Sequence, residues 1–144
     1  MSHVSSYATQ ICFRHVAGGG RLEEDPAWEI LQQAAQAVAE AHGGRLSQTV
    51  TDVFGRQVRC DLAVSFPEFR QGIGIKIDRK TGELSFLYDA YGKSPELLQG
   101  LTGEIVQNYT SVAVARALQE MHYEVDLEET GSGEARRVVV RGVL

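Results

Sequence analysis

The sequence predicts an α+β protein: a two-layer sandwich in which two main helices lie on one face of a mainly antiparallel sheet of about six or seven strands. Segments of alternating apolar and polar residues, typical of strands, outnumber the two segments with helical spacing. Short turns join most consecutive strand segments, so that neighbours in the sequence must pair antiparallel. Hydrophobic residues make up 43% of the 144 residues, which suits one core, and residues 1–144 are expected to form a single domain.

The N-terminal third predicts a strand followed by a helix. Alternation over residues 9–16 indicates a half-buried strand, which a glycine run then ends. Asp25 and Pro26 form a helix start, with a carboxylate at the N-cap and proline at the first helical position. Apolar residues then recur at helical spacing until the glycine pair at 43–44, where the helix is expected to end.

The middle of the chain predicts four strands. Residues 45–53 form a weaker one, rich in threonine and valine. The alternation over residues 58–66 is the clearest in the chain, and it places Cys60 on the apolar face with its even-numbered neighbours. Residues 72–78 and 84–88 follow as a hairpin, because the residues between them have turn composition.

The C-terminal third predicts a second helix and a hairpin. The Ser94-Pro95 pair starts the helix. Gly100 and Gly103 are expected to break it into a short lead-in and a longer helix. Alternation over residues 123–127 and a valine-rich segment at 137–141 predict two final strands, which complete the sheet.

Charge and cysteine content limit the classes of function. The 19 acidic and 14 basic residues give a net charge of −5, which repels phosphate backbones unless basic residues cluster. Arg136 and Arg137 are adjacent in a predicted strand and point to opposite faces, so nucleic acid is not an expected partner. The two isolated cysteines and the lack of an apolar leader segment predict a cytoplasmic protein, and no apolar run is long enough to span a membrane.

The sequence contains no catalytic or cofactor motif, so we expect a protein that is not an enzyme and needs neither cofactor nor metal. Cys60 is expected to be structural, because burial raises the pKa of a thiol. Modification of Cys12, on the polar face of its strand, remains open, as does a metal chelate formed by Ser2 and His3 at the N-terminus. The histidines lack metal-site spacing, and His42 is expected to sit favourably at a helix end.

The strongest candidate site is the junction between the strand at 84–88 and the second helix. Asp89, Tyr91 and Lys93 combine charge and a stacking surface beside a flexible glycine. Gln107 and Tyr109, on the helix that follows, are expected to face the same cleft. The alternative is that the tyrosines are core aromatics with their hydroxyls at the rim.

A second candidate surface is the strand at residues 72–78. Gly72 and Gly74 leave its outer face bare beside Lys76, so that another molecule can approach the backbone there. An exposed sheet edge invites strand addition, and the C-terminal valine hairpin offers a similar surface. The sequence therefore favours a protein-interaction or adaptor module that binds another protein or a second copy of itself. The alternative is a small-ligand-binding protein or enzyme with its cleft near residues 88–92 and the following helix.

Short motifs in order along nearly the whole chain resemble one family. They are Met1-Ser2-His3, Thr9-Gln10-Ile11, Asp61-Leu62-Ala63-Val64, Gly72-Ile73-Gly74-Ile75, Gly82-Glu83-Leu84, Tyr88-Asp89-Ala90-Tyr91-Gly92, Gln107-Asn108-Tyr109 and Val138-Val139-Val140-Arg141. The family is the hypothetical chloroplast reading frame thirty-five family of cyanobacteria and plastids, with bacterial relatives in the same domain of unknown function. The resemblance implies a soluble cytosolic or stromal protein. Because genes of that family often lie near one for an AAA-type ATPase, it also implies a partner or adaptor of such an ATPase. The chain departs from the family pattern in a longer segment over residues 17–44 and in lacking a tryptophan at 88–92.

Overall fold

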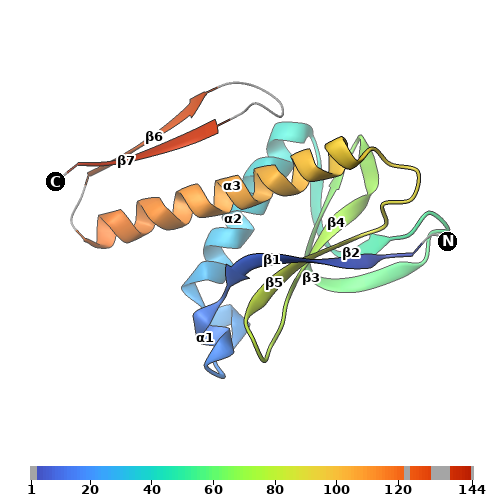
Figure 1. Ribbon diagram of the computed structural model, residues 1–144, viewed down its shortest axis with the longest axis horizontal. Helices are drawn as coiled ribbons and strands as arrows, with labels where there is room; N and C mark the ends of the chain where they lie inside the picture. The colour runs from blue at the N-terminus through green and yellow to red at the C-terminus, as the bar shows by residue number, and fades with distance from the viewer. Residues whose placement is uncertain (1–2, 122–123, 131–136, 144) are drawn as a thin grey trace.

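The computed structural model describes residues 3–121, 124–130 and 137–143, the last two segments as backbone. Its centre is a five-stranded sheet in the order β1-β5-β4-β3-β2, in which all neighbours are antiparallel (Figure 1). The strands are β1 (Ser5–Cys12), β2 (Arg45–Thr51), β3 (Gln57–Phe66), β4 (Phe69–Ile77) and β5 (Glu83–Tyr88). The predicted α+β class is therefore confirmed.

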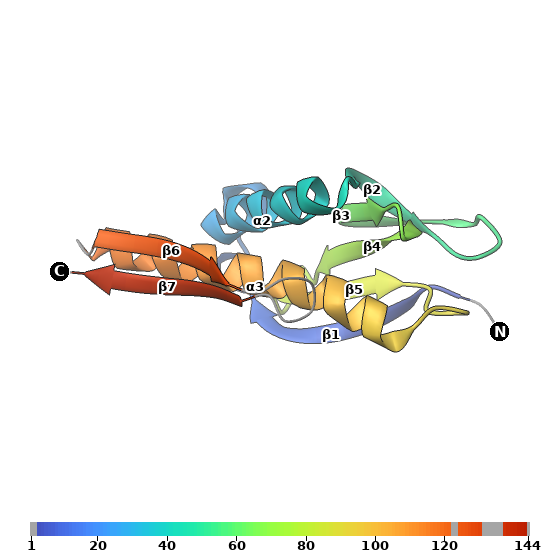
Figure 2. The ribbon, with the colours of Figure 1, turned by 90° about the horizontal axis from the view of Figure 1, so that it is seen from above.

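Two long helices cover one face of the sheet (Figure 2). The helical segments are α1 (Arg14–Ala17), the 3-10 turn η1 (Leu22–Glu24), α2 (Pro26–His42) and α3 (Pro95–Glu120). The predicted start of α2 is confirmed, because the side chain of Asp25 accepts the N–H of Ala27 at 2.9 Å. Its predicted end is confirmed by Gly43, which adopts a left-handed φ of 67°.

The core lies between the two helices and the sheet. The apolar faces of both helices and of all the central strands belong to one cluster of buried side chains. Its largest fully buried members are Phe13, Leu31, Phe66, Phe69, Ile73, Ile75, Ile77, Leu84 and Ile105. Because α2 and α3 share this cluster, both lie on the same face of the sheet, as the sequence predicts.

The α3 helix runs without a break, so the predicted interruption at Gly100 and Gly103 is wrong. A glycine inside a helix costs about 1 kcal/mol relative to alanine. Leu98, Leu101 and Ile105, on the same stretch, are each buried against the sheet. Burying one such side chain contributes about 1.5–3 kcal/mol, which outweighs the glycines.

The C-terminal hairpin does not complete the main sheet. β6 (Glu124–Thr130) and β7 (Arg137–Val143) form a separate two-stranded sheet beside the C-terminal half of α3 (Figure 1). The predicted sheet of six or seven strands is therefore wrong, because the 26-residue α3 carries the hairpin away from β1–β5. Within the described part of the chain, no helix combines the length and apolarity needed to cross a membrane.

The β2–β3 hairpin bends sharply halfway along its length. Ser47 pairs with Ala63, but the next pair is Thr49 with Arg59, so β3 carries two more residues than β2 between these pairs. Such bulges bend a strand and increase its twist. β2 contacts β4 and β5 as well as β3, although neither is its neighbour in the sheet, and Val50, beyond the bend, lies against Gly74 of β4. The end of the hairpin therefore folds over the sheet face that the helices leave open.

Candidate functional site

A single buried carboxylate holds two loops together at one end of the sheet. Asp89, only 1% exposed, accepts the N–H of Val53 at 3.1 Å and the N–H of Tyr91 at 3.0 Å, one on each oxygen. Val53 lies in the β2–β3 loop and Tyr91 in the β5–α3 loop, which meet at the same end of the molecule (Figure 1). The predicted site residue Asp89 thus organises the main chain around it.

The β2–β3 loop is also fixed from within. Asp52, 4% exposed, accepts the N–H groups of Phe54 and Arg56 at 2.9 Å each, and its other oxygen binds the Arg56 guanidinium. Burial by itself raises the pKa of Asp52, but the hydrogen bonds from Arg56 and Phe54 outweigh it, and the pKa lies below its usual value of 3.8. The carboxylate therefore stays charged at neutral pH and keeps the loop in one shape.

These two anchored loops expose apolar side chains. Phe54 is 72% exposed, Tyr91 61% and Val53 38%. The guanidinium of Arg56 lies 5.5 Å from the centre of the Phe54 ring. We call Val53, Phe54 and Tyr91 the loop tip. Single exposed apolar residues are common on protein surfaces, but here two exposed aromatic rings stand on loops that one buried carboxylate joins.

Of the other residues predicted at this junction, Lys93 is exposed with its ammonium 5.8 Å from the centre of the Phe69 ring. Tyr88 is a core aromatic, stacked on Tyr7 with 4.2 Å between ring centres. The alternative expectation of a core tyrosine is therefore confirmed for Tyr88, and burial raises the pKa of its hydroxyl.

Gln107 and Tyr109 lie elsewhere. Tyr109 is in the fourth turn of α3, about 21 Å along the helix from its start. There it packs against Phe13, which follows β1, with 6.1 Å between ring centres. Its half-buried position, and to a lesser extent the negative charge of Asp25, raise the pKa of its hydroxyl. The structure therefore does not bring Gln107 and Tyr109 together with Tyr91 in one cleft.

Other atoms do lie close to the backbone at Gly72 and Gly74, as predicted, but they belong to the β2–β3 hairpin of the same chain and not to another molecule. A β-carbon on Gly74 would lie 3.1 Å from Val50 Cγ1 and 3.0 Å from Cys60 Sγ. β4 is the central strand of the sheet and has no free edge, and of the three predicted residues on it only Lys76 is exposed. The predicted bare face is wrong, because the bent hairpin covers it with Val50 and Cys60.

The bend also moves Cys60 to the other face of the sheet. It packs with Val50 and Ala63, whereas Leu62 and Val64 face the helices. The predicted shared face is wrong because β3 is irregular between Arg59 and Ala63 and does not keep its alternation there. Cys60 is buried, and burial raises the pKa of its thiol, as is expected of a structural cysteine. Cys12 is exposed and donates to the carbonyl of Thr81 at 3.1 Å.

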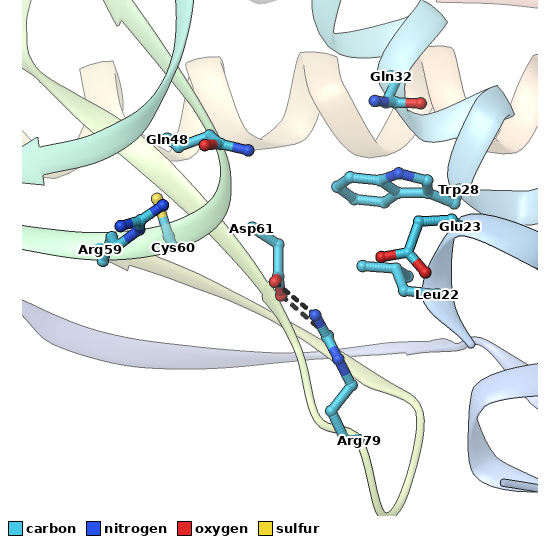
Figure 3. Close-up of a pocket in the computed structure, with 9 residues that line it drawn as sticks. All are labelled: Leu22, Glu23, Trp28, Gln32, Gln48, Arg59, Cys60, Asp61 and Arg79. Carbon is cyan, nitrogen blue, oxygen red and sulfur yellow. Dashed lines mark hydrogen bonds and ion pairs between the residues drawn. The ribbon is translucent and has the colours of Figure 1, made fainter. Parts of the chain in front are cut away.

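A pocket that the sequence analysis missed lies where the hairpin bends. We call this cavity of about 320 Å³ the bend pocket (Figure 3). The pocket is lined by Leu22, Glu23, Trp28, Gln32, Gln48, Arg59, Cys60, Asp61 and Arg79. Figure 3 shows Trp28 on the helix side, with its ring directed toward the strand side, where Gln48 and Arg59 lie. Trp28 is the one tryptophan of the chain and could have indicated a binding site, but nothing in the sequence predicted the bend of the β2–β3 hairpin that lies opposite it.

An ion pair closes the floor of the bend pocket. Where β3 turns away, Asp61 accepts the N–H of Ile77 at 2.8 Å in place of a strand partner. Arg79 donates to the two oxygens of Asp61 at 2.7 and 3.2 Å and to the carbonyl of Ile77 at 2.7 Å. These contacts explain Asp61 and Arg79 as structural residues. Arg59, in contrast, has no ion-pair partner among the residues described.

His42 ends α2, as predicted, but carboxylates rather than helix carbonyls hold its ring. Nδ1 lies 2.9 Å from Glu68 in the β3–β4 turn, and Nε2 lies 2.9 Å from Glu104 of α3. Burial lowers the pKa of His42, but the two glutamates outweigh it, so the pKa is raised above 6.5. No group of described residues has the composition of a metal site, and Ser2, named for a terminal chelate, lies outside the described residues.

Comparison of the chain with protein-family models, with curated protein sequences and with solved structures finds no match.

Proposed function

We propose that the protein is a non-enzymatic interaction module whose loop tip contacts a protein partner. The observation that carries the proposal is the carboxylate of Asp89, which fixes both loops while Phe54 and Tyr91 stay largely in solvent. Aromatic side chains are enriched in protein–protein interfaces, and a preformed patch loses little conformational entropy on binding. Arg56, beside Phe54, adds a group that is also favoured at interface centres.

The partner that we propose is a cytoplasmic AAA-type ATPase assembly. The resemblance of the chain to the reading frame thirty-five family supports this choice, and the loop tip supplies a surface of suitable chemistry. A second copy of the chain is the alternative partner, and it predicts self-association that depends on the same three side chains.

Site-specific photo-crosslinking in the native cytoplasm tests the proposal. A photoreactive phenylalanine analogue replaces Phe54 or Tyr91 in turn. A matched control places it at Lys80, an exposed residue of the β4–β5 turn. The expected result is one dominant crosslinked protein, an ATPase subunit or a second copy, from the two loop-tip positions and not from position 80. The same products from all three positions, or none from the loop tip, would refute the proposal.

Binding to the purified crosslinked partner then measures the contribution of the patch. The double variant Phe54→Ser/Tyr91→Ser is expected to weaken binding at least tenfold, because hot-spot aromatic residues carry about 2 kcal/mol or more each. Both side chains are exposed, so the melting temperature should stay close to that of the wild type. Unchanged affinity in this variant would remove the loop tip from the interface.

A further inference from the structure

The strand β1 is a free edge of the main sheet. It forms the border of the sheet opposite β2, and among the described residues it pairs with β5 alone (Figure 2). Five of its eight residues are exposed and the other three are half-buried. An edge strand presents a row of main-chain N–H and C=O groups that have no strand partner, and this row is a template for one further strand.

The β1 edge lacks the features that protect other edge strands, which are charged side chains, proline and bulges. The opposite edge strand, β2, begins with Arg45 and is bent where its pairing with β3 shifts. Ser5–Cys12, in contrast, contains neither a charged residue nor proline, although each of the other four strands carries at least one charge. Over Ser5–Ala8 the strand pairs with β5 residue by residue, and its register shifts only after Ala8. The first half of β1 is therefore regular and unprotected.

The absence of charge favours a second copy of the chain as the added strand. When two copies of one strand pair antiparallel about a two-fold axis, any charge in the strand brings an identical charge to the other side of that axis. Like charges across a strand pair are destabilising. A strand of a different protein imposes no such condition, because it can carry the opposite charge. In a chain with 23% charged residues, an uncharged edge strand is the arrangement that self-pairing needs.

Tyr7 is the residue best placed to lie at the axis. Residues that face each other in an antiparallel pair have the same hydrogen-bonding direction, so one residue of β1 must face its own counterpart. The Tyr7 ring is stacked on Tyr88 with 4.2 Å between ring centres, yet the residue is still 38% exposed. With the axis at Tyr7, the two Tyr7 side chains form a cross-strand aromatic pair on one face of the joined sheet, and Ser6 faces Ala8 of the other copy.

We propose that two copies of the chain associate by antiparallel pairing of β1 about a two-fold axis at Tyr7. The two five-stranded sheets then form one continuous sheet, with the helices of both copies on the same face. This surface uses none of the loop-tip side chains, so self-association and partner binding succeed or fail independently.

Analytical ultracentrifugation of the whole protein, from micromolar to millimolar concentration, tests the association. The expected mass rises toward twice the 15.8 kDa of one chain. Ala8 is exposed, and Ala8→Lys or Ala8→Glu places like charges beside the axis, so each is expected to weaken self-association at least tenfold. An equal mixture of these two variants is expected to restore the dimer. The matched control Ala37→Lys changes an exposed alanine of α2 and should associate as the wild type does. Circular dichroism and melting temperature verify that each variant folds.

Disulfide trapping locates the axis. In a Cys12→Ser background, single cysteines replace Ser6, Tyr7 or Ala8 in turn, and the proteins are oxidised mildly. Only a residue at the axis faces its own counterpart, so Tyr7→Cys is expected to give the most covalent dimer. Counterparts of the other two positions lie two residues further apart along the strands, beyond the separation of about 7 Å between α-carbons that a disulfide spans. A maximum at either of those positions, or equal yields at all three, would overturn the placement of the axis at Tyr7.

The remaining outcomes separate this surface from others. A chain that stays monomeric at millimolar concentration, or an Ala8→Lys variant that associates as the wild type does, would overturn the proposal. A mixture of the lysine and glutamate variants that stays monomeric would do the same. Loss of the dimer in Phe54→Ser/Tyr91→Ser would place self-association at the loop tip instead. Crosslinking from a photoreactive residue at position 8 to a different protein, with the chain itself monomeric, would show that a partner strand occupies the edge.

Discussion

Replacement of His42 by glutamine should destabilise the protein in a manner that depends on pH. The ring of His42 joins the end of α2 to Glu68 in the β3–β4 turn and to Glu104 in the middle of α3. Each nitrogen lies 2.9 Å from a carboxylate oxygen, and only the protonated ring can donate from both. The side chains of His42, Glu68 and Glu104 are 25%, 37% and 12% exposed, so water screens the pairs only in part.

The expected loss follows from these contacts. Partly exposed ion pairs contribute about 0.5–1 kcal/mol each, so two of them give about 1–2 kcal/mol at pH 6. In a protein of this size that corresponds to a fall in melting temperature of about 3–8 °C. Glutamine is close to histidine in size and neutral, so the contact of the ring with Phe66 is the main packing that the substitution changes.

The sign of the pH dependence follows from the raised pKa of His42. Below the unfolded value of 6.5 the ring is protonated in both states, and the whole contribution is present. As the pH rises through the folded pKa, the ring loses its proton and the contribution disappears. The difference in stability between wild type and His42→Gln should therefore be largest near pH 6 and small at pH 9.

Urea unfolding at pH 6 and pH 9 measures this difference. His15→Gln is the matched control, because the His15 ring is 44% exposed and lies 3.8 Å from the carboxylate of Glu24. It should show no comparable dependence on pH. A His42→Gln difference that is equal at the two pH values, or larger at pH 9, would refute the reasoning, as would a His42 pKa below 6.5 measured by NMR.

Three further predictions concern the backbone, the loop anchor and the thiols. Gly82→Ala should lower the free energy of unfolding by about 2 kcal/mol or more, because Gly82 has a φ of 74° and a β-carbon there would lie 2.2 Å from the main-chain oxygen of Phe13. Gly92 has a similar φ of 72° but open space around it, so Gly92→Ala should lower the free energy of unfolding by only about 1 kcal/mol. Equal losses for the two variants would contradict this account. Asp89→Asn should lower the free energy of unfolding by about 1–3 kcal/mol and speed amide hydrogen exchange in the β2–β3 loop, because the asparagine amide has one acceptor oxygen for the N–H groups of Val53 and Tyr91. Unchanged hydrogen exchange in this loop would exclude the anchoring role of Asp89. A thiol reagent should modify Cys12 quickly and Cys60 only on unfolding, and a Cys12→Ser variant that still reacts quickly would show that Cys60 is accessible.

Local signals predicted the elements that depend on few residues. The Asp25-Pro26 start and the Gly43 end of α2 appeared where the sequence placed them, because capping involves groups only a few residues apart. The turn that ends at Gly82 appeared for the same reason, since its left-handed residue and the Asp78 hydrogen bonds are local.

The candidate site was predicted only in part. The composition of residues 88–92 indicated a junction of interest, and Tyr91 is indeed exposed there. The partner loop was not predictable, because the hydrogen bond between Asp89 and Val53 joins residues 36 positions apart. Tyr109 was expected in the same cleft as Tyr91, but a long helix carries its later turns away from its start, and Tyr109 packs against Phe13 instead.

The sequence by itself determined the α+β class and the positions of the two helices and most strands. These follow from periodicity and local hydrogen bonding. Only the tertiary structure decided that the β2–β3 hairpin bends, that Gly72 and Gly74 receive Val50 and Cys60, and that Trp28 faces Arg59 across a pocket. A bulge changes which face each later side chain occupies, and its position depends on packing between distant segments, which alternation along a single strand does not contain.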